Sequence, residues 1–134
     1  MSLSTYLWVA LGGALGSVAR YACSSLAAAW FGETFPFGTL IINVVGSFVI
    51  GFFAAVTGPD GRLLVAGDMR QFVMVGICGG YTTFSSFSYQ TLTLAQGGEF
   101  VRAGANIVGS VVFCLLAVWL GWVAGHGLNA VKGS

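Results

Sequence analysis

Long apolar stretches separated by short polar segments dominate this chain. They cover about residues 4–30, 38–56, 71–95 and 101–125, and each approaches or exceeds the roughly 20 residues that a membrane-crossing helix needs. The connections between them hold most of the charged side chains, and none is long enough for a soluble domain. The pattern predicts an all-α integral membrane protein with four transmembrane helices in one domain, residues 1–134, and both termini on one side.

Composition strengthens this prediction and excludes other classes. Hydrophobic residues make up 57% of the 134 positions and charged residues only 7%, whereas a soluble domain carries about 25% charged residues. A net charge of +1 offers no basic patch, so we expect no nucleic acid as partner. The apolar composition makes membrane lipid the expected surrounding. The Lys and Arg residues are almost balanced between the two sides, which permits insertion in both orientations.

The third apolar stretch contains the most informative segment, GGYTTFSSFS, which runs from Gly79 to Ser88. Lipid cannot hydrogen-bond hydroxyl groups, so polar residues at that depth must face protein, water or an ion. The paired glycines, Gly79 and Gly80, favour a break in the helix. Because broken helices commonly build ion sites in membrane proteins, the segment predicts a broken third helix beside an ion site.

A few other polar residues lie inside the apolar stretches. Asn43 has apolar neighbours on both sides, and an unsatisfied amide there would cost several kcal/mol, so it faces either an interhelical partner or a permeant species. Asn106 and Ser110 are four residues apart and share one helix face, which favours a polar track, although a serine can also bond to its own backbone. Arg20 either extends its side chain to the interface or pairs with backbone carbonyls.

Two aromatic residues accompany the hydroxyl groups. Phe84 and Phe87 are three apart, so they project from one face of a helix. Such a pair is often simply core or lipid-facing, but a ring edge is electropositive and can contact a small anion. Neutral amide and hydroxyl donors combined with ring edges suit an anion that must lose its water.

Signatures of other activities are missing. The single histidine, His126, lies at the end of the last stretch, and nothing places it beside Ser85 or Ser86 as a hydrolase would require, so we expect no enzyme. No acidic residue lies inside a stretch, which argues against a proton-coupled drug or cation exporter. A membrane scaffold without transport would account for the 21 glycines, including the Gly12/Gly16 and Gly121/Gly125 pairs, but not for Asn43 and the hydroxyl cluster.

Three motifs together resemble the Fluc (CrcB) fluoride channels. They are Gly38-Thr39-Leu40 followed by Asn43, the segment from Gly79 to Ser88, and Gly109-Ser110. The similarity covers essentially the whole chain, including the spacing of Gly16 and Arg20. The ten-residue motif of the third stretch is its most specific part.

The resemblance implies a fluoride-specific channel that passively exports cytoplasmic fluoride across the bacterial inner membrane and lowers its toxicity. It further implies an antiparallel homodimer of dual topology with two pores. The pore residues carried over are Asn43, Phe84, Phe87 and Ser110, with Thr39 and Ser86 nearby and Asn106 as a further donor. A structural Na⁺ at the dimer centre would be held by backbone carbonyls of Gly79 and Thr82, while Arg20 and Gly80 would be structural. Tyr81 receives no role.

Overall fold

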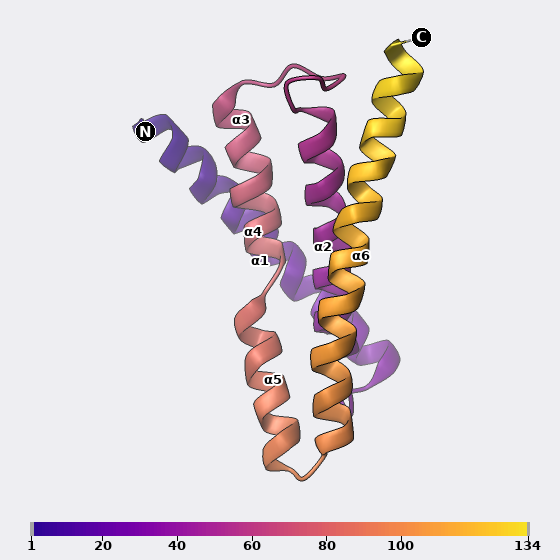
Figure 1. Ribbon diagram of the computed structural model, residues 1–134. Coiled ribbons are helices and arrows are strands. Elements are labelled where there is room, and N and C mark those ends of the chain that lie inside the picture. Colours follow the sequence, from indigo (N-terminus) through magenta and orange to yellow (C-terminus); the bar gives the residue numbers. More distant parts are fainter. Residues whose placement is uncertain (1, 134) are drawn as a thin grey trace.

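The computed structural model describes residues 2–133, and helices form nearly all of it. The all-α class predicted from the sequence is therefore confirmed. Both termini lie at the same end (Figure 1). The elements in chain order are α1 (Leu3–Phe31), α2 (Phe37–Val56), α3 (Gly67–Gln71), the π-helical segment η1 (Phe72–Cys78), α4 (Gly79–Tyr81), α5 (Phe84–Gln96) and α6 (Phe100–Gly133).

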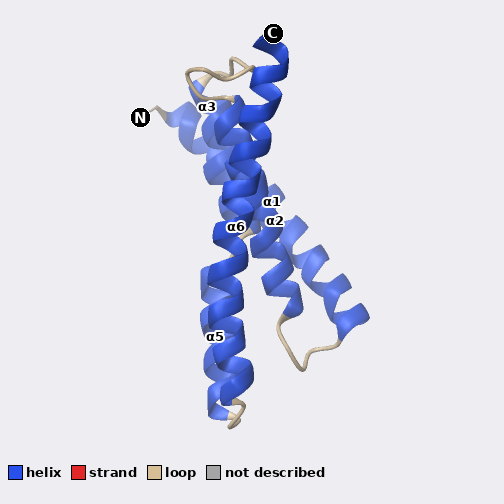
Figure 2. Cartoon of the chain, turned by 45° about the vertical axis from the view of Figure 1, so that its right-hand side comes forward, coloured by secondary structure: helices blue, strands red, loops and turns tan. Residues whose placement is uncertain are grey.

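Four helical columns result, because α3, η1, α4 and α5 follow one another along one path. Helix α1 crosses behind the other columns at a slant, and α5 lies beside the first half of α6 (Figure 1). The end formed by α1, α2 and their connection diverges from the end formed by α5 and α6 (Figure 2). The connection itself is short because Gly32 has a φ of 73°, a left-handed conformation that glycine adopts readily.

Glycines allow α1 to pack directly on the backbone of the third column. A Cβ atom on Gly12 would collide with the carbonyl of Phe72, and one on Gly16 would collide with the carbonyl of Ile77. A Cβ on Gly80 would come within 2.7 Å of the Gly13 carbonyl oxygen. The small residues are thus required for close approach, as the small-xxx-small pattern predicts.

The third column leaves helical geometry at Thr82 and Thr83. Thr82 has φ −80° and ψ 157°, and Thr83 has φ −151° and ψ 109°, both extended. Gly79 itself is helical, with φ −65° and ψ −36°. The expectation that Gly79 and Gly80 make the break is therefore wrong in position. These residues are helical, and Gly80 instead permits contact with α1.

Helices α2 and α6 also pack directly on each other's backbone. A Cβ on Gly121 would collide with the carbonyl of Phe48, and one on Gly51 with that of Val118. Within the described chain, these two helices are long and apolar enough to cross a membrane. With 34 residues, α6 is about 51 Å long, well beyond the roughly 30 Å of a hydrocarbon core.

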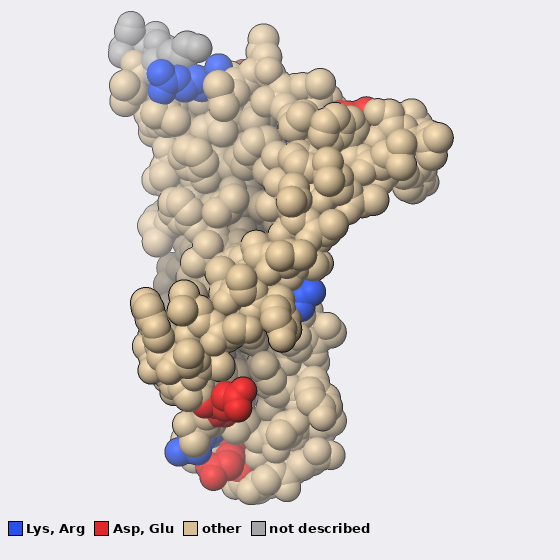
Figure 3. Space-filling model, turned by 180° about the vertical axis from the view of Figure 1, so that it is seen from behind, with Lys and Arg blue, Asp and Glu red and all other residues tan. Residues whose placement is uncertain are grey.

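The outer surface is mainly apolar. Large side chains such as Leu7, Val18, Val108 and Leu115 are more than half exposed, whereas few large residues are fully buried. Charged side chains gather towards the two ends of the face in Figure 3, with only one basic patch between them. A surface of this kind is covered by lipid or by another protein chain rather than by water.

Candidate functional site

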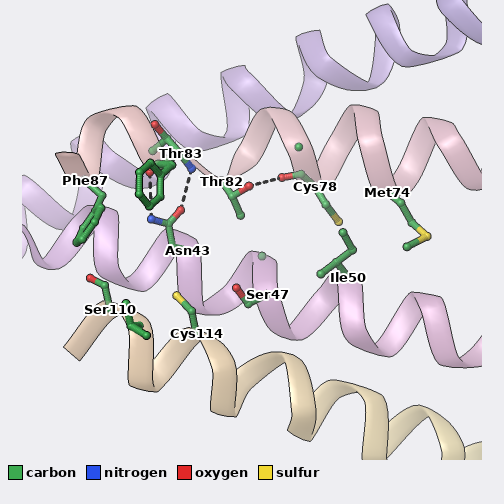
Figure 4. Close-up of a pocket in the computed structure, with 14 residues that line it drawn as sticks. Asn43, Ser47, Ile50, Met74, Cys78, Thr82, Thr83, Phe87, Ser110 and Cys114 are labelled. Atoms are coloured by element: carbon green, nitrogen blue, oxygen red, sulfur yellow. Dashed lines mark hydrogen bonds between the residues drawn. The ribbon is translucent and has the colours of Figure 1, made fainter. Parts of the chain in front are cut away.

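A cavity of about 330 Å³ lies where the break in the third column faces α2 and α6 (Figure 4). Side chains from α2, η1, α5 and α6 surround it, together with the extended residues Thr82 and Thr83. The polar residues on its wall are Asn43, Ser47, Thr82, Thr83 and Ser110, and its apolar wall includes Phe84, Phe87, Met74, Ile50 and Cys114. The structure therefore brings most of the predicted pore residues to one place.

Asn43 projects from α2 to the break and pairs with the backbone of Thr83. Its side-chain Nδ2 donates to the Thr83 carbonyl over 3.1 Å, and its Oδ1 accepts from the Thr83 amide over 2.8 Å (Figure 4). The amide thus replaces the helical partners that an extended residue loses. The interhelical bond left open by the sequence is present, and one Nδ2 proton remains for a further acceptor.

The break frees carbonyl oxygens at the end of α4. The Thr83 amide bonds to Asn43 instead of the Gly79 carbonyl, its partner in a continuous helix. Arg20 donates from Nε to the Gly80 carbonyl over 3.0 Å, which is the second of the two alternatives considered for Arg20. Gly79 and Thr82 both lie on the cavity wall.

Helix α5 begins beside the cavity, with Thr83 as its N-cap. The Thr83 hydroxyl accepts from the amide of Ser86 over 3.1 Å, which is the usual capping bond. This start places Phe84 and Phe87 on the cavity wall, with ring centroids 5.3 Å apart and planes at 54°. Phe84 is 78% exposed, so its ring is free to meet another molecule.

A chain of hydrogen bonds joins α6 to α5 behind the cavity wall. Ser110 donates to Asn106 Oδ1 over 3.4 Å, and Asn106 Nδ2 donates to the Thr91 hydroxyl over 2.9 Å. Asn106 is 2% exposed and is not on the wall, whereas Ser110 is. The shared face predicted for Asn106 and Ser110 is confirmed, and Ser110 is the member that reaches the cavity.

Besides Asn106, two predicted pore residues lie off the wall of the first cavity. Thr39 lines a second cavity, of about 240 Å³, next to the α1–α2 connection, together with Glu33 and Gln90. The Gln90 Oε1 atom is buried and has no hydrogen-bond partner among the described residues. Ser86 is absent from the wall of the first cavity and contributes its amide to the cap on α5.

Two residues whose hydrogen bonds hold the site together were missed by the sequence analysis. Thr83 had no separate role, although a threonine directly before a helical run is a typical N-cap signal. Thr91 gave no signal at all, because its importance depends on how α5 is aligned with α6.

The first cavity has the chemistry of an anion site rather than a catalytic or multivalent-metal site. Its wall carries amide and hydroxyl groups and two phenylalanine rings but no carboxylate. Within the described residues, no three His, Cys, Asp or Glu side chains are grouped so as to hold a metal ion. Neutral donors of this kind can replace the water around a small anion without binding it irreversibly.

Comparisons with known proteins agree with this chemistry. A family model described as "CrcB-like protein, Camphor Resistance (CrcB)" matches residues 7–122. A protein of Opitutus terrae named "Fluoride-specific ion channel FluC" is 63% identical over 98% of this chain and all of its own length. A protein of the same name from Rhodospirillum rubrum is 64% identical over 93% of this chain and 97% of its own.

Proposed function

Because the chain belongs to the CrcB family, we propose that it is a fluoride-specific ion channel that passively exports cytoplasmic fluoride. The observation that carries this proposal is the cavity at the helix break, where neutral amide and hydroxyl groups and two phenylalanine rings come together without a carboxylate. Asn43, Phe84, Phe87 and Ser110 contact the ion in this account. Thr39 and Ser86 lie along the path beyond them, and Asn106 acts through Ser110. Arg20 and Gly80 are structural, since they tie α4 to α1.

The selectivity follows from the spacing and strength of these donors. Fluoride is smaller than chloride and holds its water more tightly, so a narrow path must offer close, fixed donors in return. The Asn43 amide is held in place by Thr83, which prevents it from turning away from the ion. Fixed donors of this kind stabilise an anion without the reorganisation that flexible ones require.

No energy coupling is needed for export. Hydrogen fluoride crosses lipid uncharged and dissociates in the neutral cytoplasm, which traps fluoride there. A negative-inside potential drives an anion outward by about 2.3 kcal/mol per 100 mV. In this account the chain lies in the bacterial inner membrane, all four columns cross it, and export lowers fluoride toxicity.

The channel works as an antiparallel homodimer of dual topology in this proposal. The exposed apolar surface, the 78% exposure of Phe84 and the weak charge asymmetry support it. An antiparallel pair places the two helix breaks face to face across a two-fold axis and completes two fluoride paths.

A structural Na⁺ fits the same arrangement. The Gly79 and Thr82 carbonyls lose their helical partners, because the Thr83 amide bonds to Asn43 and the Ser86 amide bonds to the Thr83 hydroxyl. Both residues lie on the cavity wall. Carbonyl oxygens from the two subunits would hold the ion. The ion would satisfy carbonyl groups that have lost their helical partners, and it would join the subunits. The absence of carboxylates on the wall favours a monovalent ion over Ca²⁺.

A growth experiment tests the proposed function. Bacteria that lack their own fluoride exporter should grow in fluoride-containing medium when they express this chain. Growth should depend on external acidity, since acid raises the concentration of hydrogen fluoride that enters. Expressing cells that remain as sensitive as the parent strain, with the protein present in the membrane, would contradict the proposal.

A further inference from the structure

The hydrogen bonds behind Ser110 run in one direction. Ser110 donates to Asn106, Asn106 donates to Thr91, and Thr91 donates to the carbonyl of Phe87 over 2.7 Å. Each group in this series donates a hydrogen bond to the next, so the Ser110 hydroxyl hydrogen points away from the cavity. An anion at the wall needs that proton, because a hydroxyl oxygen repels it.

Thr91 sets this direction. Its hydroxyl proton is committed to the Phe87 carbonyl, four residues earlier in α5, so towards α6 it offers only an acceptor. The Asn106 amide must therefore turn its nitrogen to Thr91 and its oxygen to Ser110. Asn106 is 2% exposed, so water has little opportunity to offer the amide another arrangement.

From these contacts we propose that Thr91 is a positioning residue that controls the Ser110 hydroxyl through Asn106. This rests on the proposed fluoride path. The Ser110 hydroxyl donates its hydrogen bond to Asn106 until fluoride arrives, and it then rotates to donate to fluoride in the cavity. The 3.4 Å length of the Ser110–Asn106 bond makes the exchange easy, because hydroxyl hydrogen bonds are strongest near 2.8 Å. The arrangement weakens fluoride binding moderately, which favours release and flux.

The test is Thr91→Val, measured as fluoride current against fluoride concentration in planar bilayers. Valine keeps the shape but removes the acceptor, so the Asn106 amide inverts and donates to Ser110. The Ser110 proton is then free for fluoride from the start. The half-saturating fluoride concentration should fall about two- to tenfold, the equivalent of one hydrogen bond that binding no longer breaks.

Three variants separate this role from a merely structural one. Thr91→Ser keeps the hydroxyl and should have the same half-saturating concentration as the wild type. Ser88→Ala removes an exposed hydroxyl that bonds to the Phe84 carbonyl of the same helix and lies on the wall of neither cavity, and it should leave that concentration unchanged. In a Ser110→Ala background, Thr91→Val should add no further shift.

Asn106→Leu provides a second route if Thr91→Val does not assemble. It leaves the Thr91–Phe87 bond intact and frees the Ser110 proton, so it should also lower the half-saturating concentration. A rise would overturn the proposal, because Asn106 would then itself donate to fluoride. If the wild type conducts fluoride and Thr91→Val has the same half-saturating concentration, the role of Thr91 is overturned and the proposed function stands. If the wild type itself shows no fluoride flux, the proposed function is overturned as well.

Discussion

Asn43 and Thr83 are joined by two hydrogen bonds across the point where α4 gives way to α5. One side chain thereby satisfies both backbone groups of an extended residue inside an apolar surrounding. This pairing holds the break open and fixes the direction of the Asn43 amide. The same residue is thus a support for the backbone and a donor at the cavity.

Asn43→Asp should reduce both stability and fluoride flux. A carboxylate cannot donate to the Thr83 carbonyl, and the loss of that bond costs about 1–3 kcal/mol. The added negative charge also repels an anion in a low-dielectric path. Thermal unfolding in detergent and fluoride efflux from liposomes measure the two effects.

Asn129→Asp is the matched control, because Asn129 makes a similar pair of bonds, to Ala55 and Arg62, at the far end of α6. It should lower stability alone, and full fluoride flux in Asn43→Asp would remove Asn43 from the path.

Phe87→Ile should lower fluoride flux by about tenfold with little change in stability, because isoleucine keeps bulk but lacks a positive ring edge. Phe84→Ile should behave in the same way. Efflux from liposomes measures the effect, normalised to the amount of folded protein. Phe113→Ile removes a ring that is 54% exposed on α6, away from the cavity at the break, and should conduct normally. If all three variants conduct equally, the phenylalanines serve packing only.

Gly16→Ala should destabilise the protein by roughly 1–3 kcal/mol, because its Cβ would meet the Ile77 carbonyl and a backbone atom cannot yield. Gly13→Ala is the control on the same helix, since nothing lies within 4 Å of a Cβ there. It should be neutral or slightly stabilising, given the higher helix propensity of alanine. Equal stability of the two variants would argue against the close packing of α1 on the third column.

Acid should loosen the N-terminal end of α1. Ser4 and Thr5 donate hydroxyl hydrogen bonds to Asp68, over 2.5 and 2.7 Å, and these hold the pKa of its carboxyl group below the usual 3.8. A carboxyl group whose pKa is lowered by folding stabilises the fold at pH values above its pKa in the unfolded state. This stabilisation is lost as the pH falls through the pKa of the folded state. The melting temperature should therefore drop below about pH 4 in the wild type, and less steeply in Asp68→Asn. Identical pH profiles for the two proteins would exclude this contribution.

Hydropathy and composition were enough to predict the helical class, because apolar runs of this length have few alternatives. The position of the break was not predictable in the same way. Gly80 has the freedom to leave a helix, but the contact with Gly13 uses its small size instead. The break falls at Thr83 because Asn43 of another helix offers replacement bonds there. Such partners depend on how helices are aligned, as does the pairing of Thr91 with Asn106.

The most direct test of the account is fluoride efflux from liposomes that hold the purified wild-type protein, with chloride as comparator. No proton or sodium gradient is imposed, and valinomycin carries the compensating potassium current. The account predicts rapid loss of fluoride and essentially no loss of chloride. Comparable chloride efflux, or fluoride efflux that requires a proton gradient, would contradict it.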